Sequence, residues 1–347
     1  MKIIDLRSDT VTRPGKAMLA AMMNAEVGDD VFGEDPTVRM LEELISDKAG
    51  MEAAVFLPSG TQSNLIAIMA HCERGDEYIV GQTAHCYLLE GGGAAVLGSV
   101  QPQPLDFEPD GTLALEKVAP AIKPIDHHYA RTKLLCLENT VDGRVLPLAY
   151  LQQMKFFCEQ QGLQSHLDGA RVFNAAVKLQ CSLNDISNHF NSISICLSKS
   201  LGAPVGSVLA GSSEFIKKAR RWRKVLGGGM RQAGILAAAG IYALAHHINR
   251  LADDHDNALY LASTLAELEE IDVDTAALQT NILFIRVKHH YKELQSYLQG
   301  RGIILPKQPN KQGRIRLVTH LDVSRKDLTF VGQAIKSFYC NAVSESS

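Results

Sequence analysis

Two charged residues in this chain of 347 residues stand where short apolar runs end, a position that suits chemistry. Lys199 follows the run 193–198, and a lysine leaving a buried strand is partly stripped of water, which favours the nucleophilic amine. Asp168 ends the run 165–168, where a buried carboxylate needs a cation. A third stretch, Pro58–Gln62, places a glycine and hydroxyl side chains before a predicted helix. Helix N-termini offer free amides to phosphate.

Each of these stretches has an ordinary explanation when it is taken alone. Ser59 can be a simple helix cap, Asp168 can pair with the nearby Arg171, and Lys199 can merely emerge from a strand. Together they are more specific, because pyridoxal phosphate needs a lysine to hold it, a carboxylate to keep its ring nitrogen protonated and amides for its phosphate. The combination therefore predicts a pyridoxal phosphate site.

The elements that must position these groups follow from the hydrophobic pattern. Buried strands are predicted at 53–57, 77–81, 133–138, 165–168 and 193–198, with helices between them, including 148–161. Ser59 and Gln62 fit a capping box, so a helix is predicted to begin there and to reach about residue 71. This alternation predicts an α/β fold whose mainly parallel sheet is covered on both faces. Such sheets place ligands at the carboxyl ends of their strands.

The pattern changes after about residue 250. Helices at 259–269, 291–300 and 327–339 and strands at 281–287 and 315–318 predict a small α+β unit, joined to the rest by a long helix over 230–249. The sequence thus predicts a large cofactor-binding domain over 1–250, which includes the N-terminal segment, and a small C-terminal domain over 251–347.

Composition narrows the class of protein. The net charge of −3 argues against a nucleic-acid partner. The longest nearly apolar run, 233–245, is shorter than the roughly 20 residues that a bilayer requires, and the N-terminus has no apolar signal stretch. The seven cysteines are scattered without a Cys-x-x-Cys pair. We therefore expect a cytoplasmic protein with reduced thiols, no metal site, and neither a nucleic-acid nor a membrane partner.

The chain resembles a known family, the low-specificity L-threonine aldolases, which are pyridoxal phosphate enzymes of the aspartate aminotransferase fold. The matching segments run in order over nearly the whole chain: 5–12, 28–33, 58–62, 84–85, 166–171, 197–199, 227–232 and 316–322. The resemblance implies a three-layer αβα large domain. It also implies reversible cleavage of L-threonine or L-allo-threonine to glycine and acetaldehyde, with broad use of β-hydroxy-α-amino acids.

The resemblance implies roles around the cofactor. Lys199 would hold pyridoxal phosphate covalently and Asp168 would pair with its ring nitrogen. His85 would stack on the ring, and the phosphate would be bound by Gly60 and Thr61.

Further residues would bind the substrate. Arg171 would lie by the cofactor hydroxyl and the substrate carboxylate, which Ser8 and Arg316 would also grip. His128 would approach the β-hydroxyl group. Lys224 and Arg231 resemble positions that reach the cofactor phosphate of a neighbouring subunit, which implies a homotetramer with sites at a dimer interface.

Two questions stay open at this point. His85 and His128 are both candidates for the base that takes the β-hydroxyl proton, with water as a third, since histidine titrates near neutral pH. The preference between threonine and allo-threonine is not decided either. The alternatives are a β-eliminating lyase on the same scaffold, which would release pyruvate and ammonia, and a cofactor-binding protein without catalysis.

Overall fold

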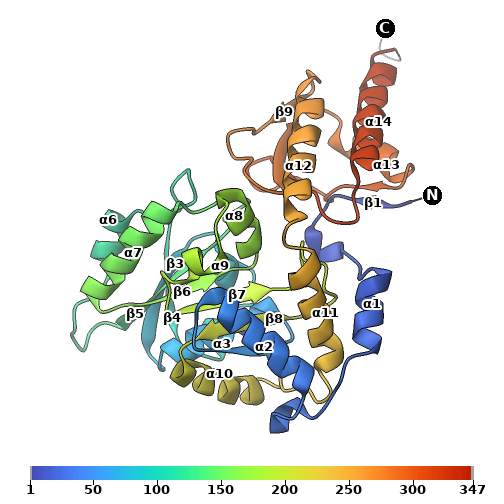
Figure 1. The fold of residues 1–347 in the computed structure, drawn as a ribbon. Coiled ribbons are helices and arrows are strands. Elements are labelled where there is room, and N and C mark those ends of the chain that lie inside the picture. The colour runs from blue at the N-terminus through green and yellow to red at the C-terminus, as the bar shows by residue number, and fades with distance from the viewer. Residues whose placement is uncertain (1, 345–347) are drawn as a thin grey trace.

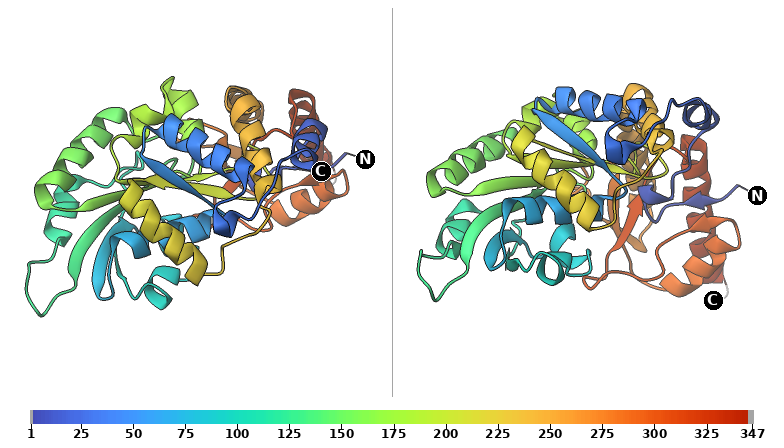
Figure 2. Two further views of the ribbon diagram at one scale, coloured as in Figure 1. Left: turned by 60° about the horizontal axis from the view of Figure 1, so that its bottom comes forward. Right: turned by 90° about the horizontal axis from the view of Figure 1, so that it is seen from below.

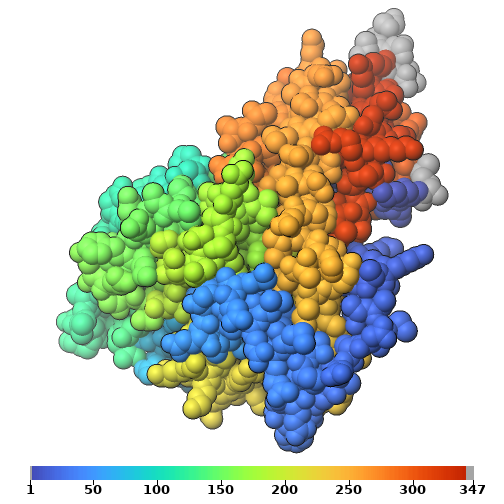
Figure 3. All heavy atoms as spheres, viewed as in Figure 1, coloured from blue at the N-terminus to red at the C-terminus, as the bar shows by residue number. Residues whose placement is uncertain are grey.

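The structure, a computed structural model, describes residues 2–344, and it describes side chains up to residue 340. Figure 1 shows two parts: a helix-covered sheet, and a smaller C-terminal part that begins with α12, after α11. Figure 3 shows the orange and red C-terminal part standing above the larger body. Among the residues described, no helix combines the length and the apolar character needed to cross a membrane.

The large part is built on a seven-stranded sheet. In spatial order its strands are β2 (Ala53–Leu57), β8 (Ser207–Gly211), β7 (Ser192–Cys196), β6 (Gln164–Asp168), β5 (Arg131–Glu138), β3 (Asp76–Gly81) and β4 (Gln101–Leu105). Only β8 runs antiparallel to its neighbours in this sheet. The predicted α/β fold with a mainly parallel sheet is confirmed, whereas the predictions did not include β4 and β8.

Helices cover both faces of this sheet, as the left view of Figure 2 shows. Alternate residues of β2 point to opposite faces: Phe56 joins a core that reaches α2, whereas Val55 and Leu57 pack with α3 and α10. The helices of this part are α1 (Lys16–Met23), α2 (Pro36–Ala49), α3 (Gly60–His71), α4 (His85–Leu88), α5 (Gly93–Val96), α6 (Leu115–Val118), α7 (Leu148–Gln161), α8 (Val172–Leu179), α9 (Leu183–Ser187), α10 (Ser213–Val225) and α11 (Gly234–His246), with short 3-10 turns at Asp9–Val11 (η1), Asp30–Phe32 (η2) and Ala119–Ala121 (η3).

Helix α3 begins where the sequence predicted it. The Ser59 hydroxyl accepts a hydrogen bond from the Gln62 backbone N–H at 3.1 Å, which caps the helix. The predicted capping box is only half formed, because the Gln62 side chain donates to the Leu226 carbonyl instead of returning to Ser59. The segment predicted to bind phosphate nevertheless stands at a capped helix N-terminus, directly after β2.

The C-terminal part has its own core. Strands β9 (Ile271–Val273), β10 (Ile282–Val287) and β12 (Ile315–Val318) form an antiparallel sheet, packed by α12 (Leu251–Ala266), α13 (Tyr291–Gln299) and α14 (Arg325–Ser344). The N-terminal strand β1 (Ile4–Asp5) pairs with β11 (Ile303–Ile304), and Ile4 and Leu6 are buried in this second core. The sequence assigned the N-terminal segment to the large domain; the boundary at residue 250 stays a prediction.

The predicted connecting helix over 230–249 is shorter than expected. Helix α11 begins at Gly234 and ends at His246, and α12 begins anew at Leu251. The helix predicted at 259–269 therefore starts eight residues earlier than the pattern indicated, because Leu251 is buried and opens its apolar face.

Candidate active site

Charged side chains meet at the carboxyl edge of the central strands. Asp168 is the last residue of β6 and is paired in register with Glu138, the last residue of β5. Lys199 lies three residues beyond the end of the neighbouring strand β7. Parallel strands end at the same edge, so the topology brings these three positions together. Sequence reasoning missed Glu138, although it ends an apolar run in the same way as Asp168 does.

Asp168 is a buried carboxylate without a cation. It is 2% exposed and accepts hydrogen bonds from the Asn64 side-chain amide at 2.8 Å and from the Ala170 backbone N–H at 3.1 Å. Within the part of the chain that the structure describes, no arginine, lysine or histidine forms a salt bridge with it. The alternative that Asp168 pairs with Arg171 is wrong.

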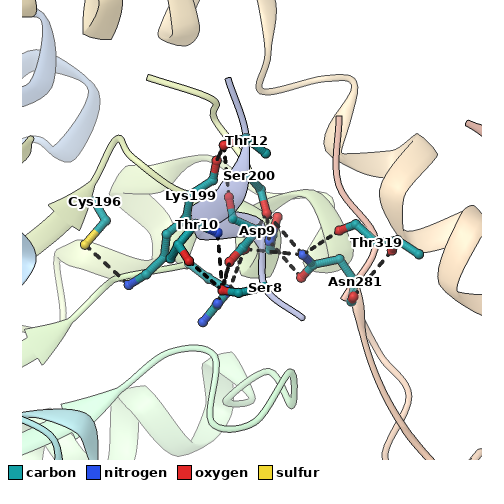
Figure 4. Close-up of polar contacts among 11 residues, drawn as sticks. Ser8, Asp9, Thr10, Thr12, Cys196, Lys199, Ser200, Asn281 and Thr319 are labelled. Carbon is teal, nitrogen blue, oxygen red and sulfur yellow. Dashed lines mark hydrogen bonds and ion pairs between the residues drawn. The ribbon is translucent and has the colours of Figure 1, made fainter. Parts of the chain in front are cut away.

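Arg171 is instead paired with Asp9. Its guanidinium donates two hydrogen bonds to the Asp9 carboxylate, at 2.8 and 2.6 Å, and the Ser200 hydroxyl donates a third at 2.8 Å. Burial alone would raise the pKa of Asp9, which is fully buried, but the charge and hydrogen bonds of Arg171 hold it well below its usual value. Figure 4 shows Asp9 between Lys199, Ser200 and Asn281. No local pattern in the sequence indicates this pair.

Arg316 comes from the C-terminal part. It is partly buried on β12, and burial, followed by the positive charge of Arg171, lowers the pKa of its guanidinium. Among the described residues none accepts a hydrogen bond or forms a salt bridge with its side chain. A buried arginine without an anion is costly, so this position suits the carboxylate of a ligand.

His85 stands at the start of α4 beside two acidic groups. Its ring Nδ1 lies 2.8 Å from a carboxylate oxygen of Glu90, and its backbone N–H donates to Glu138 at 2.9 Å. The hydrogen bond to Glu90 raises the pKa of His85, which burial opposes. Burial and the charge of Asp168 raise the pKa of Glu138 to about 7. Glu138 therefore titrates near neutral pH, where proton transfer is favoured, and the raised pKa of His85 favours its protonated form.

Cys196 lies between Lys199 and the N-terminus of α3 and contacts both. Its Nζ lies 3.6 Å from the Cys196 sulfur, as Figure 4 shows. A Cβ atom added at Gly60 would lie 2.5 Å from the same sulfur, so a glycine is required for this close approach. Thr61, the next residue of α3, is exposed, and the Ser8 hydroxyl caps η1 by accepting from the Thr10 N–H. The predicted phosphate-binding segment and the predicted lysine are thus neighbours.

Three predicted residues form no hydrogen bond or salt bridge with Lys199 among the described residues. His128 is exposed, bonded to Asp126 at 2.6 Å, and precedes β5, whose far end carries Glu138. At about 3.3 Å a residue, β5 separates them by roughly 25 Å. Lys224 ends the basic side of α10, and Arg231 pairs with Asp29 at 2.8 Å. His128 and Arg231 thus each have an acidic partner within this chain.

Comparison with known proteins agrees with this geometry. A family model described as "Beta-eliminating lyase" matches residues 5–288. The chain is 55% identical over 337 residues to the "Low specificity L-threonine aldolase" of Escherichia coli (strain K12), covering 97% of this chain and 99% of that one. It is 43% identical to the "Low-specificity L-threonine aldolase 1" of Arabidopsis thaliana, covering 95% and 94% of the two chains.

A solved structure supports the fold. The threonine aldolase of Leishmania major matches with a TM-score of 0.82 at 22% identity, over 96% of this chain and 99% of that chain. At this identity the likeness bears on the fold alone. The sequence matches carry the stronger conclusion, since they span nearly the whole length of both proteins: the chain belongs to the low-specificity L-threonine aldolases, a family of lyases.

Proposed function

We propose that this protein uses pyridoxal phosphate to cleave L-threonine and L-allo-threonine reversibly to glycine and acetaldehyde, with broad use of other β-hydroxy-α-amino acids. One observation carries the proposal. The site holds a buried carboxylate without a cation, Asp168, and a partly buried arginine without an anion, Arg316. A cofactor with a protonated ring nitrogen would supply the cation for Asp168, and a substrate carboxylate would supply the anion for Arg316.

The residues present fit this cofactor. Asp168 has neutral donors only, which leaves its charge to a ligand cation. Gly60 and Thr61 would bind the phosphate at the N-terminus of α3, where free amides point outward. Lys199 would hold the cofactor through Nζ, and His85 would stack on its ring. When bound, pyridoxal phosphate supplies an electron sink for the breaking Cα–Cβ bond.

The chain's own residues would bind and orient the substrate. Arg316, together with Ser8, would hold the carboxylate and thereby decide which bond of Cα faces the cofactor. Arg171 cannot offer its whole fork to the substrate, since Asp9 already accepts two of its N–H groups. Arg171 would therefore add a second positive charge near Arg316 and would reach the cofactor hydroxyl.

The base for the β-hydroxyl proton has two candidates. His85 lies in the site of this chain, supported by Glu90 and Glu138. His128 can serve only from a neighbouring subunit. A pH–rate profile separates them: we expect the acidic limb to change in the variant that lacks the base, so an unchanged profile in His128→Phe would exclude His128.

We further propose a cytoplasmic homotetramer, a dimer of dimers with sites at the dimer interface. In this assembly Lys224 and Arg231 would reach the phosphate bound to a partner, as the resemblance to the family implies. Phe32 in η2 lies under the guanidinium of Arg231 and is 74% exposed. Its ring offers an apolar contact to a neighbouring subunit. The expected readout is the mass of the assembly in solution.

Replacement of Lys199 tests the cofactor assignment. Lys199→Ala should abolish the visible absorbance of the purified protein, because no other amine would hold the cofactor covalently. Retained absorbance would refute this assignment.

A product assay tests the reaction. L-allo-threonine should yield glycine and acetaldehyde. The family match to beta-eliminating lyases makes pyruvate and ammonia the products of the alternative reaction. A colourless protein that binds no pyridoxal phosphate would point to neither activity.

A further inference from the structure

A chain of buried and partly buried hydrogen bonds leads from His71, the last residue of α3, to Asp168. His71 Nε2 lies 2.7 Å from the Ser192 hydroxyl, which lies 2.8 Å from His166 Nδ1. His166 Nε2 lies 3.2 Å from the Asn64 amide oxygen, and the Asn64 amide nitrogen donates to Asp168 at 2.8 Å. We call these four residues (His71, Ser192, His166 and Asn64) the relay. None of its polar atoms is a buried atom without a partner.

The relay follows from three spacings in the sequence. Asn64 and His71 are seven residues apart on α3, two helical turns, and so share a face. His166 and Asp168 are two residues apart on β6 and share a face of the sheet. Ser192 on β7 is the register partner of His166. The same packing of α3 on β6 and β7 thus aligns all the groups.

The hydrogen bonds of the relay have one direction. Asn64 contacts two carboxylate oxygens, one of Asp168 and one of Glu90 at 2.9 Å, so its NH₂ group must face them and its oxygen must face His166. His166 then donates from Nε2, which leaves Nδ1 as an acceptor for the Ser192 hydroxyl. The remaining lone pair of Ser192 accepts from His71. Every donor in the relay points toward Asp168.

Both histidines are suited to a fixed direction. Burial lowers the pKa of His71 and of His166 to about 3, so each ring is neutral and carries a single N–H. His166 and Ser192 are fully buried, and His71 stacks on Phe215 with 4.4 Å between ring centroids. Neither ring can turn without breaking its contacts, and neither changes charge near neutral pH.

We propose that His71, Ser192 and His166 are positioning residues, which act through Asn64 to hold the Asp168 carboxylate in one orientation for the cofactor. A chain of aligned donors strengthens its last hydrogen bond, which here is the one from Asn64 to Asp168. This inference rests on the proposed function, because the cofactor's ring nitrogen is what the charge of Asp168 would serve.

The first test needs no cofactor, and it uses variants only to assign the signals. In the full-length wild-type protein with ¹⁵N-labelled histidine, His71 and His166 should both be neutral with the proton on Nε2, assigned by the loss of signals in His71→Gln and His166→Gln. A proton on Nδ1 of His166 would overturn the relay. This outcome is independent of whether the protein binds pyridoxal phosphate or cleaves threonine.

The second test breaks the relay at its smallest member. Ser192→Ala should weaken the binding of pyridoxal phosphate to cofactor-free protein about tenfold, the lower end of what loss of an outer-shell partner costs at metal sites. It should lower kcat and leave KM for threonine unchanged, because Arg316 is untouched. Ser194→Ala is the matched control: Ser194 is also buried, two residues along β7, but its hydroxyl meets Ser207.

The outcomes of the second test are distinct. Equal cofactor affinity in Ser192→Ala and Ser194→Ala would refute the relay while the proposed function stands. A wild-type protein that neither binds the cofactor nor releases acetaldehyde would refute the proposed function, and the histidine tautomers would then decide the relay alone.

Discussion

Two buried carboxylates serve the same site in opposite ways. Asp9 and Asp168 are 0% and 2% exposed. Asp9 lies where the N-terminal segment joins the two cores, and it is neutralised by the guanidinium of Arg171. Asp168 lies at the end of a central strand and receives only neutral donors. The fold supplies the cation for the first carboxylate and leaves the cation of the second to a ligand.

The two arginines show the same division. Arg171 is occupied by Asp9, whereas the side chain of Arg316 has no anionic partner among the described residues. The site therefore has one open negative position in the large part and one open positive position in the C-terminal part. A cofactor that brings a cation to Asp168 and a substrate that brings a carboxylate to Arg316 would fill both positions. The two ligands would then lie between the two cores.

Asp9→Asn tests the structural half of this comparison, and we expect the largest effect from it. Loss of the charge leaves Arg171 buried without an anion and close to Arg316, which should lower the free energy of unfolding by about 3–5 kcal/mol. Chemical denaturation of the cofactor-free protein measures this. Asp168→Asn is the control, since it leaves no cation unpaired, although its single amide oxygen can accept from only one of the two donors, Asn64 and Ala170. Equal destabilisation by the two substitutions would contradict the comparison.

Asp168→Asn tests the functional half. Here the loss of stability should be smaller than in Asp9→Asn, and kcat should fall by about 10²–10³-fold, because a fixed charge aimed at the cofactor is lost. Steady-state rates of acetaldehyde release at saturating cofactor measure this effect. Full activity in Asp168→Asn would show that the open negative position is not used.

Arg316→Ala tests the open positive position. Loss of hydrogen bonds to a charged carboxylate should raise KM for threonine about 10- to 100-fold, with the affinity for pyridoxal phosphate unchanged. Arg286 on the neighbouring strand β10 is exposed, so Arg286→Ala is a matched control. If Arg316→Ala weakened cofactor and substrate binding equally, Arg316 would not be the carboxylate clamp.

The positions of Asp168 and Lys199 were predictable from sequence, whereas the pairing of Asp9 with Arg171 was not. Asp168 and Lys199 each end a short apolar run, so local pattern and topology were enough to place them at one edge. Glu138 carries the same local signal and was overlooked. The pairing of Asp9 with Arg171 spans 162 residues and joins two loops, and no periodicity encodes such a contact.

The fold shows the same limit. Strands β2 and β12 and helix α7 were predicted with their observed bounds, since each is a short apolar or amphipathic run between turn residues. The antiparallel β8 was missed, because strand direction depends on the connection and not on the run itself. The role predicted for His128 stays a prediction, since the side chain is exposed before the start of β5 and is bonded to Asp126.

The smallest expected effect is on the pH dependence of stability through Glu138. It tests whether the charge of Asp168 raises the pKa of Glu138. Burial and the charge of Asp168 raise the pKa of Glu138 to about 7, from an ordinary value near 4.5. Between these values the folded protein keeps a proton that the unfolded chain releases. Stability should therefore be greatest below about pH 4.5 as far as Glu138 is concerned, fall as the pH rises toward 7, and change no further above that.

Glu138→Gln keeps the size of the side chain and removes the titration. The difference in unfolding free energy between wild type and variant should change by about 1–2 kcal/mol between pH 5 and pH 8, in favour of the variant at the higher pH. Asp254, whose pKa burial raises to about 6, contributes equally to both proteins and cancels. In Asp168→Asn the same difference should shrink, since the charge that opposes ionisation of Glu138 is gone; a difference unaffected by Asp168→Asn would mean that burial alone sets the titration.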